Sequence, residues 1–310
     1  MNVVFCTDNN YIMPCGIAMI SLLENNSHND VIIHIVGKEL TSKNKSILEG
    51  IVSKYNTAIQ FYTINDDQLS KYKLPPTANY INISTYIRLF LFDILPTPIE
   101  KIIYLDCDLV VVDDLIDLWN TNIENYSIAG VIDSTDQIEK AYLDSQFNPQ
   151  KSYTYINAGV LLMNLNYWRE KNILEELLLY AEEKPDKILY ADQDMLNGAL
   201  TESITKIPVR YNVHMPLWSK KYKVLSIFQK EIDEGLKDRA ITHYTTSMKP
   251  WLKGCTHPFK KDFLLYKAIS PWKDLPITWG NIPRKVRRRF YKRLILGKLG
   301  IKKYRPIQIY

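Results

Sequence analysis

The amino-acid sequence predicts an α/β protein in which a mostly parallel sheet is flanked by helices. Short apolar runs alternate with segments of helical period along the first part of the chain. A further apolar run, residues 102–105, ends abruptly at two carboxylates, Asp106 and Asp108. Ligands of such sheets bind at the carboxyl ends of the strands, so we expect the functional site at that edge.

The alternation predicts the individual elements in order. The expected strands are 2–6, 31–36, 59–63, 102–105, 127–132 and 160–163, and the expected helices are 11–23, 42–55, 84–92, 167–183 and 191–200. Ser84 is a plausible N-cap for its helix. Asp8 follows the first strand and Asp133 follows a later one, so Asp8 and Asp106 should share the carboxyl edge. The polar segment 134–154 is expected to be a mobile loop over the site.

Length and composition indicate a soluble globular enzyme. The chain has 310 residues, of which 46% are hydrophobic and 24% charged. It has no apolar run of membrane-spanning length, and its N-terminus reaches Asp8 too early for a secretory signal, so a cytoplasmic protein is expected. Four cysteines without paired spacing predict reduced thiols. Neither glycine-rich phosphate-binding loop is present, so a phosphate-bearing ligand would need a metal and side chains.

Asp106 and Asp108 are predicted to bind a divalent cation. Residues i and i+2 of an extended chain point the same way, so both carboxylates can converge on one hard ion while Cys107 turns toward the fold. A solvated turn is the bland alternative. The chemical alternative is an aspartyl-phosphate phosphatase, whose signature is also an apolar strand followed by Asp-x-Asp. That signature usually lies on a chain's first strand, and here about a hundred residues precede it.

Several other residues are candidates with open alternatives. Arg88, amid apolar neighbours, either extends to solvent or faces an anion. Asn157 and Gly159 indicate a close backbone approach or a bulge. Asp192, Gln193 and Asp194 open a helix, where acidic residues are common for dipole reasons alone. His243 ends a short strand, where a lone histidine is more often a core residue, but it precedes Lys249, Pro250 and Trp251, which suggest a phosphate-binding loop.

The C-terminal tail, residues 282–310, differs in charge from the rest of the chain. Eleven of the 39 basic residues lie between Arg284 and Arg305, and no acidic residue follows Asp274. The remaining 28 basic residues are outnumbered by 34 acidic ones. Aromatic and aliphatic residues interrupt the basic run, as in a basic amphipathic helix lying on an anionic membrane surface. Nucleic-acid binding would leave the aliphatic residues without a role, and a helix packed on its own domain is the bland alternative.

Six motifs together give the chain a family resemblance. They are FCTDNNY, STYIRLF, IIYLDCDLVVVDDLIDLW, YINAGVLLMNLNYWR, ADQDMLNG and HYTTSMKPW, and they span about residues 1–260. In this order and at these separations they resemble the family 8 retaining glycosyltransferases, close to the bacterial lipopolysaccharide α-galactosyltransferases. The resemblance implies a GT-A fold with a catalytic domain at 1–260. The charge pattern of the tail predicts that the extension at 261–310 attaches to a membrane surface.

The resemblance also implies roles for the candidate residues. Asp106, Asp108 and His243 match the family's metal ligands, for Mn²⁺ with Mg²⁺ as an alternative, and Lys249 matches a lysine on the UDP diphosphate. Asp8 and Asn10 match positions that hold uridine. The positions around the donor sugar are matched by Arg88, Asp133, Asn157, Asp192 and Gln193, of which Gln193 and Asp192 are the catalytic candidates. Thr246 replaces a family glycine, and Tyr80 stands near a usual histidine.

The expected function is metal-dependent transfer of galactose or glucose from a UDP-sugar to a cell-surface glycan or glycolipid, with an α linkage and no nucleic-acid partner. The enzyme would lie at the inner face of the cell membrane. A catalytically silent glycan-binding protein is the non-enzymatic alternative, but pure binding would not need Asp106, Asp108 and His243 together.

Overall fold

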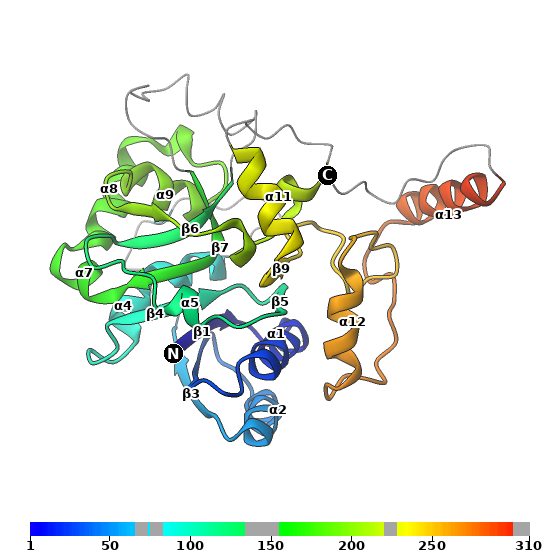
Figure 1. The fold of residues 1–310 in the computed structure, drawn as a ribbon, viewed down its shortest axis with the longest axis horizontal. Helices are drawn as coiled ribbons and strands as arrows, with labels where there is room; N and C mark the ends of the chain where they lie inside the picture. The colour runs from blue at the N-terminus through cyan, green and yellow to red at the C-terminus, as the bar shows by residue number, and fades with distance from the viewer. Residues whose placement is uncertain (66–73, 75–82, 134–154, 220–227, 300–310) are drawn as a thin grey trace.

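A computed structural model describes residues 1–65, 74, 83–133, 155–219 and 228–299 (Figure 1). Tyr80, the predicted loop 134–154 and residues 300–310 of the tail lie outside the described residues. A central sheet of seven strands has the order β3-β2-β1-β4-β7-β6-β8. In that order the strands are β3 (Ala58–Thr63), β2 (Ile32–Gly37), β1 (Asn2–Thr7), β4 (Lys101–Leu105), β7 (Ile156–Asn164), β6 (Ile128–Ile132) and β8 (Ile204–Lys206).

The sheet is mostly parallel, as predicted, and β7 is its one reversed strand among the described residues. β1 pairs in parallel with β2 and β4, whereas β7 runs antiparallel to both β4 and β6. Leu105 at the end of β4 therefore lies opposite Val160 near the start of β7. The reversal brings Asn157 and Gly159 to the edge at which β4 ends, beside Asp106.

A small second sheet completes that edge. It consists of β5 (Leu109–Val111) and β9 (Ile241–His243), which pair antiparallel. Leu109, directly after Asp108, lies opposite His243. This pairing joins two segments that lie more than a hundred residues apart in the sequence.

Helices cover both faces of the central sheet (Figure 1). The α-helices are α1 (Ile12–Asn25), α2 (Ser42–Val52), α4 (Leu91–Ile94), α5 (Ile116–Trp119), α7 (Leu165–Glu170), α8 (Ile173–Glu183), α9 (Asp192–Ala199), α10 (Met215–Trp218), α11 (Gln229–Lys237), α12 (Lys260–Ala268) and α13 (Arg284–Lys298). The 3₁₀ helices are η1 (Ser53–Tyr55), η2 (Ile83–Phe90), η3 (Pro185–Lys187) and η4 (Val209–Tyr211).

Alternation along the strands divides the core into two layers. Val3 and Phe5 pack with residues of α1 and α2, while Val4 between them packs on the other face with residues of α8 and α9. Ile103 and Ile102 of β4 divide in the same way. Successive side chains of a strand point to opposite faces, so continuous apolar strands are required where helices cover both faces.

The predicted helix at 84–92 is wrong in type. The structure has the 3₁₀ helix η2 followed by the short α4. Side chains at i and i+3 eclipse in a 3₁₀ helix, which places Thr85 and Arg88 together. The Nε of Arg88 donates to the Thr85 carbonyl at 3.2 Å, and the Thr85 hydroxyl donates to Asp192 at 3.0 Å. The tighter winding thus directs both residues to one carboxylate.

The single helix predicted at 167–183 is also wrong, because the chain breaks there into α7 and α8. Asn172, between them, has a left-handed backbone with φ of 51°. Asn adopts this conformation more readily than most residues, so it can end one helix and start another.

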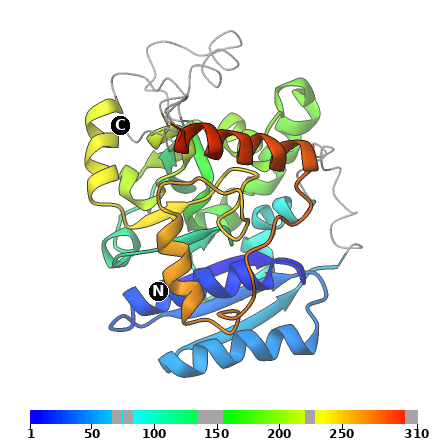
Figure 2. The same cartoon turned by 90° about the vertical axis from the view of Figure 1, so that its right-hand side faces the viewer.

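Part of the C-terminal region packs on the body of the protein and part projects from it. The amide of Asn25 in α1 donates to the hydroxyl of Tyr266 in α12 at 2.7 Å. α13 extends away from the body (Figures 1 and 2). Trp279, just before α13, makes edge contacts with Phe290 and Tyr291. Within the described part of the chain, no helix is both long and apolar enough to span a bilayer.

Candidate active site

Asp106, Asp108 and His243 form a metal-binding group at the carboxyl edge of the sheet. One ligand atom from each lies within 4.8 Å of the others. The Nε2 of His243 is 3.1 Å from Asp108 Oδ1 and 3.6 Å from Asp106 Oδ2. The short segment between β4 and β5 supplies the carboxylates and β9 supplies the imidazole. The pairing of β5 with β9 holds the two together. Cys107, between the carboxylates, is buried and directs its thiol to the carbonyl of Cys6, as predicted.

Gly159 gives this group the space it occupies. A methyl group at Gly159 would clash with the His243 ring and come within 2.8 Å of Asp106 Oδ2. The irregularity between β6 and β7 lies instead between Gly130 and Ile132. The close-approach interpretation therefore explains Gly159 better than a bulge. Two carboxylates and an imidazole around a cradle that tolerates no Cβ fit a divalent cation.

Lys249 lies against the same group. Its ammonium forms an ion pair with Asp108 Oδ2 and donates to the Tyr244 carbonyl at 2.8 Å. Burial alone would raise the pKa of Asp108, but the charges of Lys249 and His243 outweigh it and hold this pKa below its ordinary value. Asp108 is therefore an anion over the whole neutral range, the state in which a carboxylate binds a metal.

Arg88 is buried and faces carboxylates, which resolves its two alternatives. Its guanidinium lies 3.1 Å from Asp106 Oδ1 and 2.8 Å from Asp192 Oδ2. It also stacks on the ring of Tyr104 at 4.5 Å. Burial raises the pKa of Asp192 to about 6, although Arg88 acts in the opposite direction. Arg88 thus bridges the metal-binding group and α9.

A cluster of buried polar side chains, referred to below as the sugar pocket, lies beyond Arg88. Gln193 accepts from the backbone N–H of Ala158 at 3.0 Å and donates to Asp133 Oδ2 at 3.1 Å. Asn157 donates to the same Asp133 oxygen at 3.1 Å. The other oxygen, Asp133 Oδ1, is buried and has no hydrogen-bond partner among the residues that the structure describes. A buried acceptor of this kind is costly unless a ligand supplies a donor.

The remaining predicted residues lie at the end of β1 and in the loop after β9. Asp8 Oδ1 accepts from the backbone N–H groups of Asn10 and Tyr11 at 2.8 and 3.0 Å, which fixes the turn before α1. The Thr246 hydroxyl lies 3.5 Å from the carbonyl of Met248, within its own loop. Asp194 is structural, because it accepts from the Tyr155 hydroxyl at 2.6 Å and from the backbone N–H of Leu189.

Sequence reasoning missed two residues of the site. Tyr104 donates its hydroxyl to Asp106 Oδ1 at 2.7 Å, and Asn212 contacts His243. Tyr104 lies within an apolar strand, where an aromatic residue is ordinary. Asn212 lies between Tyr211 and Val213, which are buried. A polar residue between apolar neighbours was the only feature of the sequence that could have marked it as a candidate.

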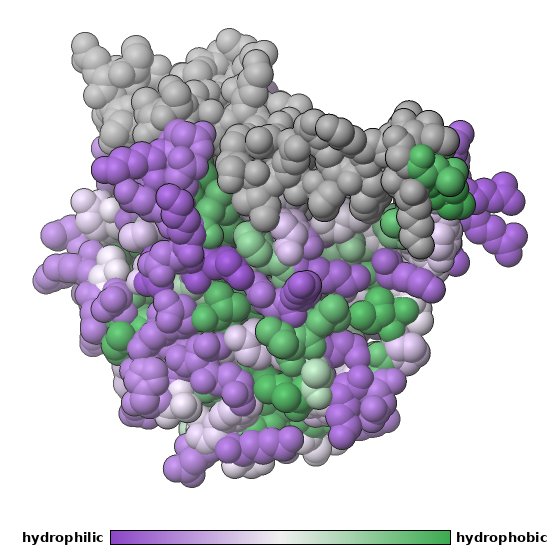
Figure 3. All heavy atoms as spheres, turned by 45° about the vertical axis from the view of Figure 1, so that its right-hand side comes forward, coloured by the Kyte–Doolittle hydropathy of each residue, from purple (hydrophilic) through white to green (hydrophobic). Residues whose placement is uncertain are grey.

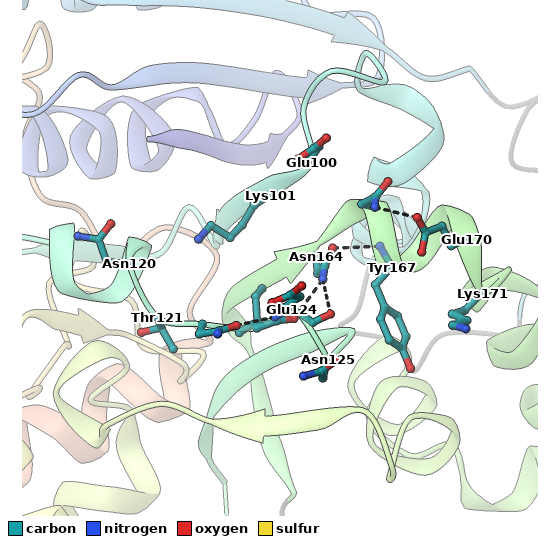
Figure 4. Close-up of a pocket in the computed structure, with 13 residues that line it drawn as sticks. Glu100, Lys101, Asn120, Thr121, Glu124, Asn125, Asn164, Tyr167, Glu170 and Lys171 are labelled. Carbon is teal, nitrogen blue, oxygen red and sulfur yellow. Dashed lines mark hydrogen bonds between the residues drawn. The ribbon is translucent and has the colours of Figure 1, made fainter.

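A pocket of about 820 Å³ lies at the opposite edge of the sheet (Figure 4). Lys101 at the start of β4 and Asn164 at the end of β7 line it, together with Tyr167. Asn164 is engaged by the loop carbonyls of Ile123 and Glu124. None of the predicted site residues lines this pocket.

The fold and the metal-binding group define a metal-binding α/β protein with its site at the carboxyl edge of a mostly parallel sheet. The chain belongs to glycosyl transferase family 8, whose family model matches residues 2–255. It is therefore a glycosyltransferase. The two alternatives raised by the sequence, a phosphatase and a catalytically silent glycan-binding protein, are not supported.

Individual relatives agree with this assignment. General stress protein A of Bacillus subtilis is 27% identical over 89% of this chain and 96% of its own length. A lipopolysaccharide 1,2-glucosyltransferase of Escherichia coli is 29% identical over 96% of this chain and 86% of its own. The crystal structure of the galactosyltransferase LgtC, in complex with donor and acceptor sugar analogues, has a TM-score of 0.73 at 22% identity and covers 93% of this chain and 100% of its own. The shared fold is of the GT-A type, as the sequence predicts.

Proposed function

We propose that the protein transfers galactose or glucose from a UDP-sugar to a lipopolysaccharide-type glycan, with retention of configuration. The observation that carries the proposal is the convergence of Asp106, Asp108 and His243 beside a buried polar cluster that contains the unpaired oxygen of Asp133. The names of relatives that act on lipopolysaccharide support the acceptor class, and both hexoses occur among the named activities.

Asp106, Asp108 and His243 would hold Mn²⁺. Bound there, the ion would neutralise charge that develops on the departing diphosphate. Lys249 would add a second positive charge for the diphosphate, and its present pairing with Asp108 puts its ammonium within reach. Asp8 and Asn10, at the end of the neighbouring strand β1, would hold the uridine.

The donor sugar would occupy the pocket of Asp133, Asn157 and Gln193. Asp133 Oδ1, which lacks a donor among the described residues, would accept from a sugar hydroxyl. Arg88 would hold Asp192 in place through their ion pair. Because both reacting partners would be fixed before reaction, orientation would contribute to the rate.

Retention would proceed by a front-face route. The amide of Gln193 is a poor nucleophile, and the carboxylate of Asp192 is already engaged by Arg88 and Thr85. The acceptor hydroxyl would attack from the side on which UDP leaves, and the departing phosphate oxygen would take its proton. Gln193 would steady the cationic sugar.

The C-terminal extension is proposed to attach the enzyme to the inner face of the cell membrane, with residues 1–260 as the catalytic domain and 261–310 as the extension. Exposed apolar side chains lie on α12 and α13, and Figure 3 looks onto the side of the protein that carries both helices. The exposed apolar side chains on these helices include Leu265, Val286 and Ile295, and those of Ile269 and Leu299 directly follow the two helices. The basic residues of α13 would add attraction to anionic lipids.

The function is tested by incubating the protein with Mn²⁺ and a panel of UDP-sugars without acceptor. Slow release of UDP from UDP-galactose or UDP-glucose, abolished by EDTA, is the expected result. Release from neither hexose donor, or phosphate release from simple phosphate esters with Mg²⁺ alone, would contradict the proposal.

A further inference from the structure

Asn212 lies completely buried between the metal-binding group and the sugar pocket. Its Oδ1 is 3.0 Å from Nδ1 of His243, and its Nδ2 donates to Oδ1 of Asn157 at 2.9 Å. It directly follows η4 and precedes Val213, which bridges to Thr242 beside His243. The side chain therefore touches one residue from each half of the candidate site.

The orientation of this chain of amides is fixed by groups that have a single hydrogen-bonding role. The backbone N–H of Gly159 can only donate, and it donates to Oδ1 of Asn157 at 3.0 Å. On the other side of the same amide, Nδ2 donates to the carboxylate of Asp133 at 3.1 Å. Oδ1 of Asn157 is thus an acceptor, so the group of Asn212 that contacts it must be the donor Nδ2.

The remaining group of Asn212 is then an acceptor facing His243. A carbonyl oxygen pairs with a nitrogen that carries a proton, so Nδ1 of His243 must carry a proton whether the ring is neutral or charged. Its Nε2 points to Asp106 and Asp108, at 3.6 and 3.1 Å. This is the nitrogen whose lone pair a metal ion needs.

We propose that Asn212 is a positioning residue that holds His243 in its metal-binding tautomer and links that tautomer to the sugar pocket through Asn157. The inference rests on the proposed function, since it takes the group of Asp106, Asp108 and His243 to bind Mn²⁺. Metal-bound histidines usually donate their second ring N–H to an acceptor that fixes the ring, and losing that acceptor weakens metal binding. Here the acceptor is the side-chain amide of Asn212, and its hydrogen bond to Asn157 fixes which of its two groups faces His243.

The test is the affinity of the substrate-free protein for Mn²⁺, measured by electron paramagnetic resonance. Asn212→Leu removes the acceptor and should weaken Mn²⁺ binding about 10- to 100-fold. Asn212→Asp keeps an acceptor oxygen for His243 but loses the donor to Asn157, so its affinity should lie between those of Asn212→Leu and the wild type. Asn26→Leu is the matched control: Asn26 is equally buried and accepts from the backbone of Leu115 at 2.8 Å, away from the site.

Two outcomes overturn the inference while leaving the proposed function intact. One is Asn212→Leu with wild-type Mn²⁺ affinity, and the other is Asn26→Leu weakening Mn²⁺ binding as much as Asn212→Leu does. A wild-type protein that binds no Mn²⁺ would instead contradict the proposed function.

Nitrogen NMR of the metal-free wild type, followed to an alkaline pH at which the ring is neutral, decides the tautomer even if Asn212→Leu does not fold. The His243 signals are assigned by their loss in His243→Gln. A proton on Nδ1 is the expected result, and a His243 ring with a bare Nδ1 overturns the inference.

Discussion

At the scale of single residues, Asp108 carries the charge that the metal would meet. Changing Asp108 to Asn keeps the shape of the side chain and removes its charge, so Mn²⁺-dependent UDP release should be abolished. The protein should still fold, with a melting temperature lowered by the loss of the ion pair with Lys249. Asp117→Asn, an exposed substitution in α5, is the control and should keep full activity. Near-normal turnover of Asp108→Asn with EDTA also harmless would remove the metal from the mechanism.

Asp192 predicts a pH dependence of stability. Its pKa rises from an ordinary 3.8 to about 6 in the folded protein, chiefly through burial. Between these values the unfolded chain has lost the proton that the folded protein keeps, so the contribution of Asp192 to the free energy of unfolding falls as pH rises through this window. At about 1.4 kcal/mol per pKa unit, the contribution should fall by about 3 kcal/mol.

The measurement is urea unfolding of the wild type and of Asp192→Asn at several pH values from weakly acidic to neutral. The wild type should lose stability relative to the variant as pH rises. A difference between the two that is independent of pH would show that Asp192 titrates normally.

Gln193 predicts the stereochemical outcome. Gln193→Ala should slow transfer substantially without eliminating it. Gln193→Glu should accumulate no stable adduct, because the proposed front-face route has no covalent intermediate. NMR of the first-formed product should show an α linkage. A β-linked product would refute retention, and a hexosyl-enzyme in the intact mass of the wild type during turnover would refute the front-face route.

At the scale of elements, the start of β7 is the tightest point of the site. Gly159→Ala would put a methyl group into the His243 ring and beside Asp106, and neither the strand nor the ring has space to yield. We expect loss of Mn²⁺ binding, measured by electron paramagnetic resonance, with a lowered melting temperature.

Gly50→Ala is the matched control, because a methyl group there meets nothing within 4 Å. Gly50 lies in α2, where alanine stabilises a helix by about 1 kcal/mol relative to glycine. If Gly159→Ala bound Mn²⁺ as tightly as Gly50→Ala, the close approach at β7 would have no bearing on the site.

At the scale of the whole molecule, the proposed role of the projecting α13 predicts that membrane attachment can be separated from catalysis. Truncation after Trp279 removes α13 and leaves α12 with its contact to Asn25 of α1. Sedimentation with anionic liposomes should fall sharply at low salt, whereas transfer to a soluble acceptor should persist. Unchanged sedimentation of the truncated protein at both low and high salt would show that the tail is not the attachment.

Much of the fold could be predicted because its signals are local. The runs ending at Thr7, Leu105 and Ile132 are apolar on both faces, and such runs form strands buried between helices whatever their partners are. The same locality explains the errors. Asn172 has a left-handed backbone conformation that ends one helix and starts another. The side chains of η2 contact Asp192, more than a hundred residues away, and no local pattern shows that partner.

The sequence by itself determined which residues carry chemistry at the ends of the strands, since Asp106 and Asp108 share one face by strand periodicity alone. Only the tertiary structure decided what they meet. The direction of β7 and the pairing of β5 with β9 depend on contacts between distant segments, and these bring Gly159, Asn212 and His243 to the carboxylates. The role of a buried amide such as Asn212 depends on which groups face it, and no local pattern in the chain encodes those neighbours.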